Sequence, residues 1–240
     1  MSLAFFDDPQ GLAPPRAIKT PLPGGGFVLR SPEALEPYAR CIGDWIEQWA
    51  SATPDALALA ERDAQGQWRR VSYAELRRAV GAIGQALLDL NLPEGRPIAV
   101  LSDNSVDHAL LMLGALHVGR PVCTISSAYS RLAKDYSKIH GILRKLQPAL
   151  VYASDAAVYG SALAGADVDA AAVFSRDAEA YPGAISFDAL LRTGEGPGVK
   201  RAFDAIRPDD HAKYLLTSGS TGQPKVVINT HRMLCANQQM

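Results

Sequence analysis

The clearest alternation of apolar and polar positions lies in the middle of the chain. Residues 98–101 (Ile-Ala-Val-Leu) form a short apolar run, and residues 102–105 (Ser-Asp-Asn-Ser) bring side chains that cap helices. Residues 106–118 have the apolar content of a buried helix that closes at Gly119, and a second apolar run occupies residues 122–125. A strand, a helix and a strand in such a short stretch predict a parallel βαβ unit.

The same alternation continues through the second half of the chain. Apolar residues at helical spacing predict a helix over residues 132–146 and a shorter one over 156–163. We expect strands at residues 149–153 and 172–174, and a short helix at 187–191. Strands that alternate with helices predict an α/β fold, in which a mostly parallel βαβ sheet is layered with helices.

Two more helices and a pair of strands are predicted before this unit. Apolar residues at helical spacing predict a helix that ends near Thr53, and we expect both of its tryptophans to be core residues: Leu35, Tyr38, Ile42, Trp45, Ile46 and Trp49. Short strands are expected at residues 56–60 and 67–71. The next helix starts at Ser72, because Glu75 follows at the spacing of a capping box.

The chain divides into three segments by composition. Residues 1–32 are rich in Pro and Gly, which predicts an extended N-terminal arm with turns. Residues 33–205 make up the predicted α/β N-terminal subdomain, and Gly and Pro within residues 193–198 predict a linker near its end. Residues 206–240 are predicted to open a second, truncated subdomain.

Composition and charge exclude several classes of protein. The chain has 240 residues, 48% of them hydrophobic, and a net charge of −1, which argues against a disordered protein and against a dedicated nucleic-acid binder. Its three cysteines are far apart, so we expect buried thiols in a reducing compartment. No signal peptide or membrane-spanning run is visible, and the expected location is the cytoplasm. The sequence predicts no oligomeric state.

One segment near the end carries chemistry. An apolar run at residues 214–216 leads into hydroxyl side chains and glycines that end in Pro224 and Lys225. Glycines let backbone N–H groups approach an anion, hydroxyls add donors, and the lysine adds positive charge. We therefore predict that this loop binds phosphate through Thr217, Ser218, Gly219, Ser220, Thr221, Gly222 and Lys225.

The loop differs from the phosphate loop of P-loop NTPases. That pattern requires Gly-Lys-Ser/Thr before a helix, whereas Pro224 precedes Lys225 here and Val226 follows it. The β-branched residues 226–228 favour a strand, so the loop is predicted to join two strands of a long hairpin. A Ser/Gly-rich hairpin turn without a ligand remains the alternative.

The loop resembles the phosphate-binding signature of the adenylate-forming (AMP-binding) superfamily, which includes acyl- and aryl-CoA synthetases and peptide-synthetase adenylation domains. Thr230-His231 downstream and residues 72–76 and 98–130 upstream are also similar to that family. Within it, residues 101–105, 118–121 and 227–233 look most like bacterial feruloyl-CoA synthases. The sequence departs from the broader pattern at Val226, where glycine is usual, and this puts the fine geometry of the loop in doubt.

The resemblance implies an ATP-dependent carboxylate–CoA ligase that acts through an acyl-adenylate. The implied substrates are Mg²⁺-bound ATP, coenzyme A and a carboxylic acid, with aromatic acids favoured. The hydroxyls of Thr217, Ser218, Ser220 and Thr221 would donate hydrogen bonds to the phosphates. Gly219 and Gly222 would give backbone access, and Lys225 would supply charge. Two alternatives stay open: an adenylation domain that loads a carrier protein, and a non-catalytic nucleotide-binding or interaction module.

Other parts of the family pattern do not occur in these residues. The Tyr-Gly-x-Thr-Glu segment is missing, since the only Tyr-Gly pair, Tyr159-Gly160, continues differently and precedes the loop. The expectation is therefore an N-terminal fragment that is inactive by itself and holds no confident catalytic residue.

The remaining candidate residues favour structural roles. The five histidines show no metal-site spacing, so no metal site is predicted. For His231, a place beside the substrate pocket and a strand-end or helix-cap role both stay open. We expect Asp209 and Asp210 to form a solvated turn. A basic face on the 132–146 helix favours a solvated surface over an anion site: Lys134, Lys138, His140, Arg144 and Lys145.

Overall fold

The computed structural model describes residues 16–133, 135–217 and 224–240. Its contacts divide the chain into two compact units. One is Met1–Tyr38 with Gln239–Met240, and the other is Ala39–Gln238. Each unit is described by itself. The predicted phosphate-binding residues Ser218, Gly219, Ser220, Thr221 and Gly222 lie outside the described residues, as does Lys134.

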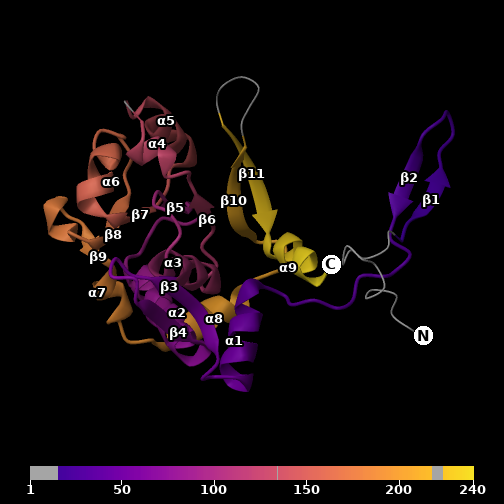
Figure 1. Cartoon of the computed structure of the whole chain (residues 1–240), viewed down its shortest axis with the longest axis horizontal. Helices are drawn as coiled ribbons and strands as arrows, with labels where there is room; N and C mark the ends of the chain where they lie inside the picture. Colours follow the sequence, from indigo (N-terminus) through magenta and orange to yellow (C-terminus); the bar gives the residue numbers. More distant parts are fainter. Residues whose placement is uncertain (1–15, 134, 218–223) are drawn as a thin grey trace. The chain divides into compact units, whose positions relative to one another are not determined.

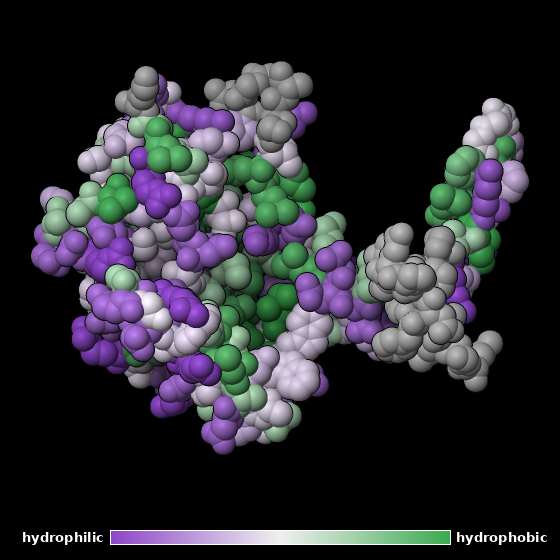
Figure 2. Space-filling model, in the orientation of Figure 1, coloured by the Kyte–Doolittle hydropathy of each residue, from purple (hydrophilic) through white to green (hydrophobic). Residues whose placement is uncertain are grey.

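The described part of the N-terminal unit is a β-hairpin. Its antiparallel strands are β1 (Ile18–Pro21) and β2 (Phe27–Arg30), joined by a turn in which glycines 24–26 all have positive φ, the region that favours glycine. The ammonium of Lys19 lies 4.3 Å from the ring centre of Phe27. Apolar side chains on this hairpin are exposed, as Figure 2 shows. The predicted extended arm thus includes a hairpin.

A seven-stranded sheet forms the centre of the second unit (Figure 1). Its order is β11-β10-β6-β5-β7-β8-β9, and each neighbouring pair is parallel except β10 with β11. This confirms the predicted α/β fold with a mostly parallel sheet. The strands are β5 (Ile98–Val100), β6 (Val122–Thr124), β7 (Leu150–Asp155), β8 (Ala171–Arg176), β9 (Ile185–Ser186), β10 (His211–Thr217) and β11 (Lys225–Thr230).

Helices pack on both faces of this sheet around two separate apolar cores. Successive strand residues face opposite ways, so Ile98 and Val100 of β5 enter one core while Ala99 enters the other. The first core is covered by α1 (Ile42–Ala52), α2 (Tyr73–Asp89), α3 (Val106–His117), α7 (Phe187–Leu191) and α8 (Pro197–Ala205). The second is covered by α4 (Ala128–Arg131), α5 (Ser137–Leu146), α6 (Ala156–Leu163) and the 3₁₀ turn Ala178–Ala180.

A two-stranded sheet precedes the main one. Its antiparallel strands β3 (Leu57–Arg62) and β4 (Trp68–Ser72) lie close to the predicted positions. The capping box that opens α2 is confirmed. The hydroxyl of Ser72 accepts a hydrogen bond from the Glu75 amide (3.3 Å), and the Glu75 carboxylate accepts one from the Ser72 amide (2.8 Å).

The first predicted helix begins later than its apolar spacing suggests. The structure starts α1 at Ile42, because Pro37 disfavours helix around it and the Asp44 carboxylate accepts hydrogen bonds from the amides of Arg40 and Cys41. The expectation for Trp49 was also wrong, since 43% of this residue is exposed.

Two other segments differ from their predictions. The helix predicted over 132–146 begins only at Ser137, as α5. The short helix α4 ends before it at Arg131, and Leu132 between the two is 73% exposed. The predicted linker over 193–198 contains the start of α8. Gly196 caps this helix, and Pro197 occupies its first turn, where a missing N–H costs nothing. The final helix, α9 (His231–Gln239), follows β11.

The three cysteines are buried and unpaired, as the sequence predicts. Burial is the main cause of the raised thiol pKa values, to about 12 for Cys123 and about 11 for Cys235. Among the described residues, no helix combines the length and the apolar character needed to cross a membrane.

A buried histidine lies where α1, α2, α3 and α8 meet. His117 is 1% exposed and stacks on Phe203 with ring centres 4.3 Å apart. Its Nε2 lies 3.4 Å from Glu47, but Arg77 pairs with this carboxylate and with Glu195. Burial, reinforced by the charge of Arg77, lowers the pKa of His117 to about 4. The folded protein therefore holds this imidazole neutral.

This burial makes stability depend on pH. In the unfolded chain His117 gains a proton near pH 6.5, whereas in the folded protein it does so near pH 4. Between these values the unfolded state binds more protons. Stability from this group is therefore complete above pH 6.5 and is lost as the pH falls towards 4, by about 3 kcal/mol. Urea unfolding at several pH values between 4 and 6.5 measures this. The free energy of unfolding should change less with pH in His117→Phe than in wild type, and an equal change in both proteins would contradict the assignment.

Candidate functional site at the carboxyl edge of the sheet

The predicted strand–loop–strand arrangement is confirmed around the Ser/Gly-rich loop. β10 and β11 pair antiparallel, and Thr217 lies opposite Lys225 at the end of this pairing. A strand follows the loop rather than a helix, which separates it from P-loop NTPases. Of the predicted phosphate-binding residues, the structure places Thr217 and Lys225 side by side. The roles of Ser218, Gly219, Ser220, Thr221 and Gly222 stay predictions.

The direction of β10 decides which edge of the sheet carries this loop. β10 runs parallel to β6, with Lys213 opposite Val122 and Tyr214 opposite Cys123. The carboxyl end of β10, Thr217, therefore lies on the same edge as the carboxyl ends of β5, β6 and β7. The chain leaves β5 through α3 to β6 on one side, then returns past β5 to β7 on the other. Such a switch point is where open α/β sheets bind ligands.

A cavity of 280 Å³ lies at this switch point. It is lined by residues 102–104, which follow β5, by residues 124–127 at the end of β6, and by His108 of α3. Sequence analysis assigned residues 102–105 to helix capping alone. The signal it missed is that polar residues follow two strands that lie next to each other in a parallel sheet.

Charge at the cavity is balanced within the protein. The Asp103 carboxylate accepts a hydrogen bond from the Ser127 hydroxyl and pairs with the Arg131 guanidinium at 2.9 Å. The hydroxyl of Ser102 is buried and has no hydrogen-bond partner among the described residues. Burial lowers the pKa of His108, and the charge of Lys213 lowers it further. The described lining is therefore close to neutral and offers hydroxyl, amide and imidazole groups.

The amino end of α3 also lies at this edge. Ser105 caps the helix by accepting a hydrogen bond from the His108 amide at 3.1 Å. The Glu61 carboxylate of β3 accepts another from the Val106 amide at 2.8 Å. The first-turn amides of α3 are thus partly satisfied by a carboxylate of the chain itself.

A lysine on α5 contacts the segment that follows the loop. The ammonium of Lys145 donates a hydrogen bond to the carbonyl of Pro224 at 3.0 Å. Sequence analysis predicted a basic face on this helix but favoured a solvated role. The spacing of basic residues gave no signal of which one approaches the loop.

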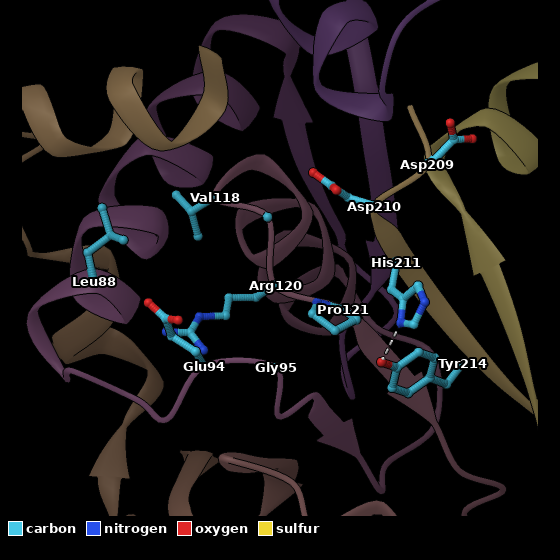
Figure 3. Close-up of a pocket in the computed structure, with 11 residues that line it drawn as sticks. Leu88, Glu94, Gly95, Val118, Arg120, Pro121, Asp209, Asp210, His211 and Tyr214 are labelled. Atoms are coloured by element: carbon cyan, nitrogen blue, oxygen red, sulfur yellow. Dashed lines mark hydrogen bonds between the residues drawn. The ribbon is translucent and has the colours of Figure 1, made fainter. Parts of the chain in front are cut away.

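A larger cavity, of 590 Å³, lies at the opposite edge (Figure 3). It is lined by Glu94, Arg120, His211 and Tyr214 among others, and Nδ1 of His211 lies 3.0 Å from the Tyr214 hydroxyl. Tyr214 is the lining residue of β10 nearest to the loop, and about 10 Å of strand separates it from Thr217. Its size alone does not connect it to phosphate binding.

The other candidate residues have structural partners. Asp209 binds the Arg232 guanidinium at 2.7 and 2.9 Å, and Asp210 accepts a hydrogen bond from the Arg207 amide. His231 begins α9 in a fully buried position, so a structural place at the end of β11 is supported. Burial lowers the pKa of His231.

Known proteins resemble most of the chain. It is 28% identical over 213 residues to 4-coumarate–CoA ligase-like 9 of Oryza sativa subsp. japonica, covering 88% of the chain and 36% of that protein. It is 27% identical over 211 residues to nonribosomal peptide synthetase 8 of Aspergillus fumigatus, covering 88% of the chain and 2% of that protein. The chain thus spans about a third or less of these curated relatives.

The fold and the family model agree with these relatives. Acetoacetyl-CoA synthetase from Streptomyces lividans superposes with a TM-score of 0.72 at 17% identity, over 93% of the chain and 34% of that structure, which supports the fold. The family model described as AMP-binding enzyme matches residues 46–240, which is more than half of the chain. This chain therefore belongs to the AMP-binding enzyme family.

Proposed function

We propose that this chain supplies the triphosphate-binding part of an ATP-dependent acid–thiol ligase. The observation that carries the proposal is the position of the loop. Thr217 and Lys225 end a hairpin at the carboxyl edge of a parallel sheet, on the same edge as the switch-point cavity. Family membership supports the use of ATP. Mg²⁺ would arrive with the phosphates of ATP.

The proposed chemistry has two steps. A carboxylate oxygen of the acid attacks the α-phosphorus of ATP, the bond to the β-phosphate oxygen breaks, and pyrophosphate leaves. A thiolate then attacks the acyl carbonyl carbon, and AMP leaves with the bonding electrons. Negative charge grows on the departing pyrophosphate in the first step, so donors placed in advance lower the barrier.

The loop residues would provide those donors. We assign hydrogen-bonding roles to the hydroxyls of Thr217, Ser218, Ser220 and Thr221, and a charge role to Lys225. Gly219 and Gly222 would let the backbone approach the phosphates. The described chain contributes no residue that we assign to proton transfer.

Two acceptors fit the same first step. Coenzyme A is our first choice of thiol. Our proposed acyl substrate is an aromatic acid, with ferulate as the first candidate. The rice relative named as a 4-coumarate–CoA ligase-like protein supports this choice. The peptide-synthetase relative favours the second candidate, an adenylation domain that passes its acyl group to a carrier protein. The two differ in the thiol, not in the use of the loop.

The loop is testable by substitution. We expect Thr221→Ala or Lys225→Ala in the intact gene product to slow pyrophosphate release by about 10²–10³-fold, because each change removes one donor to the leaving group. Carboxylate-dependent exchange of labelled pyrophosphate into ATP measures this step. Lys200→Ala on α8 removes the same charge far along the chain from the loop and should leave exchange unchanged. Wild-type exchange in both loop variants would remove the loop from the mechanism.

The substrate is testable separately. Pyrophosphate release by the intact gene product should be fastest with ferulate or a benzoate and slow with fatty acids. Addition of coenzyme A should then give an acyl-CoA that mass spectrometry detects. If the protein forms the adenylate but no acyl-CoA, and instead acylates a carrier protein, the acceptor is the carrier protein and not coenzyme A. The absence of exchange with every carboxylate, together with the absence of ATP binding, would favour the non-catalytic module.

A further inference from the structure

One residue of the basic face of α5, Lys145, contacts the chain just before Lys225. Lys138, Arg144 and Lys145 all lie on this helix, and Lys145 donates a hydrogen bond to the carbonyl of Pro224. Pro224 is buried, and its carbonyl belongs to the peptide bond that leads into Lys225. A hydrogen bond to a charged donor is stronger than one between neutral groups. This contact therefore fixes the peptide plane before Lys225.

Pro224 makes this restraint more effective. Its ring already fixes φ near −65°. Holding its carbonyl restrains ψ as well, so the backbone that enters β11 has little freedom. The next residues are held too: Val226 packs on the second core together with Leu216 and Tyr214. Lys145, Pro224 and Val226 thus hold the start of β11 against α5.

The opposite face of the hairpin carries the candidate phosphate ligands. Side chains alternate along a strand, so Lys225 and its partner Thr217 face away from the side on which Val226 and Leu216 pack. Lys145 approaches from the α5 side. The two lysines therefore lie on opposite faces of the hairpin. Lys145 contacts the backbone from the α5 side, and Lys225 is on the face where phosphates are expected.

Lys138, on the same helix, has a different contact. The ammonium of Lys138 lies 4.0 Å from the ring centre of Tyr129, within the α4–α5 region. Lys145 also occupies the last turn of α5, where the helix dipole favours a cation, so its charge is stabilised there with or without a ligand. Lys145 is therefore charged and bound to the Pro224 carbonyl without any phosphate.

We propose that Lys145 is a positioning residue for phosphate binding: by holding the Pro224 carbonyl it sets the direction in which Lys225 points. The inference rests on the proposed function, since it assumes that Lys225 contacts phosphate. Lys145 acts through the backbone and does not touch the phosphates.

Three variants of the intact gene product test this role. Calorimetry with MgATP and with magnesium pyrophosphate should show binding weakened about fivefold to thirtyfold in Lys145→Met, because the Pro224 carbonyl loses its donor. Lys145→Arg keeps a charged donor and should restore affinity to within about threefold of wild type. Lys138→Met is the matched control, with the same charge change on the same helix, and should bind as wild type does.

Hydrogen exchange separates positioning from direct contact. In the ligand-free chain, amides in residues 225–230 should exchange faster in Lys145→Met than in wild type or Lys138→Met, since the start of β11 is less restrained. Weakened binding with unchanged exchange would assign Lys145 to the phosphates themselves and overturn the positioning role. Equal weakening in Lys145→Met and Lys138→Met would reduce the effect to general charge and overturn it as well.

The outcome also distinguishes this inference from the proposed function. If the wild-type protein binds neither ligand and shows no pyrophosphate exchange, the proposed function fails. If wild type binds and Lys145→Met binds equally well, the proposed function stands and the positioning role is wrong. Thermal melting of each variant verifies that it is folded before binding is compared.

Discussion

The pairing of β10 with β6 is the contact on which the candidate site depends. It places the Ser/Gly-rich hairpin in the main sheet and gives it the same direction as its neighbour, with Tyr214 opposite Cys123. Were β10 antiparallel to β6, the loop would lie at the amino edge, beside the larger cavity. The direction of one strand therefore decides which polar groups share an edge with the loop.

Packing on the two faces of the sheet supports this pairing. One core lies beneath α2 and α3, the other beneath α5 and α6, and strand residues alternate between them. The hairpin joins the second core through Tyr214, Leu216 and Val226, whose burial is partial. Exposed apolar residues remain on the hairpin, including Leu215 and Val227. The hairpin is thus held to the sheet mainly from its α5 side.

Much of the fold could be predicted because its signals are local. The apolar runs of β5 and β6, the capping residues Ser72 and Ser105, and the β-branched strand after the loop all acted within a few residues. The errors came where a local rule outweighed the spacing of apolar residues. Pro37 delayed α1, and Pro197 started α8 inside a segment expected to be a linker.

The site was predicted less completely, because its members are distant in sequence. Hydroxyls and glycines before Lys225 identified the loop, but nothing in the spacing of α5 singled out Lys145, and nothing joined Ser102 to Ser127. Such neighbours follow from strand order, which periodicity does not specify. The predicted division of the chain at residue 205 stays a prediction.

The carboxylate of Glu61 at the start of α3 bears on how an anion approaches this sheet. In many doubly wound proteins the helix after the first strand offers its free amides to a phosphate. Here the Val106 amide already donates to Glu61, whose carboxylate also pairs with Arg69 at 3.2 Å. A phosphate could bind the Val106 amide only by displacing this carboxylate. An anion that binds this sheet would therefore need donors other than the first turn of α3.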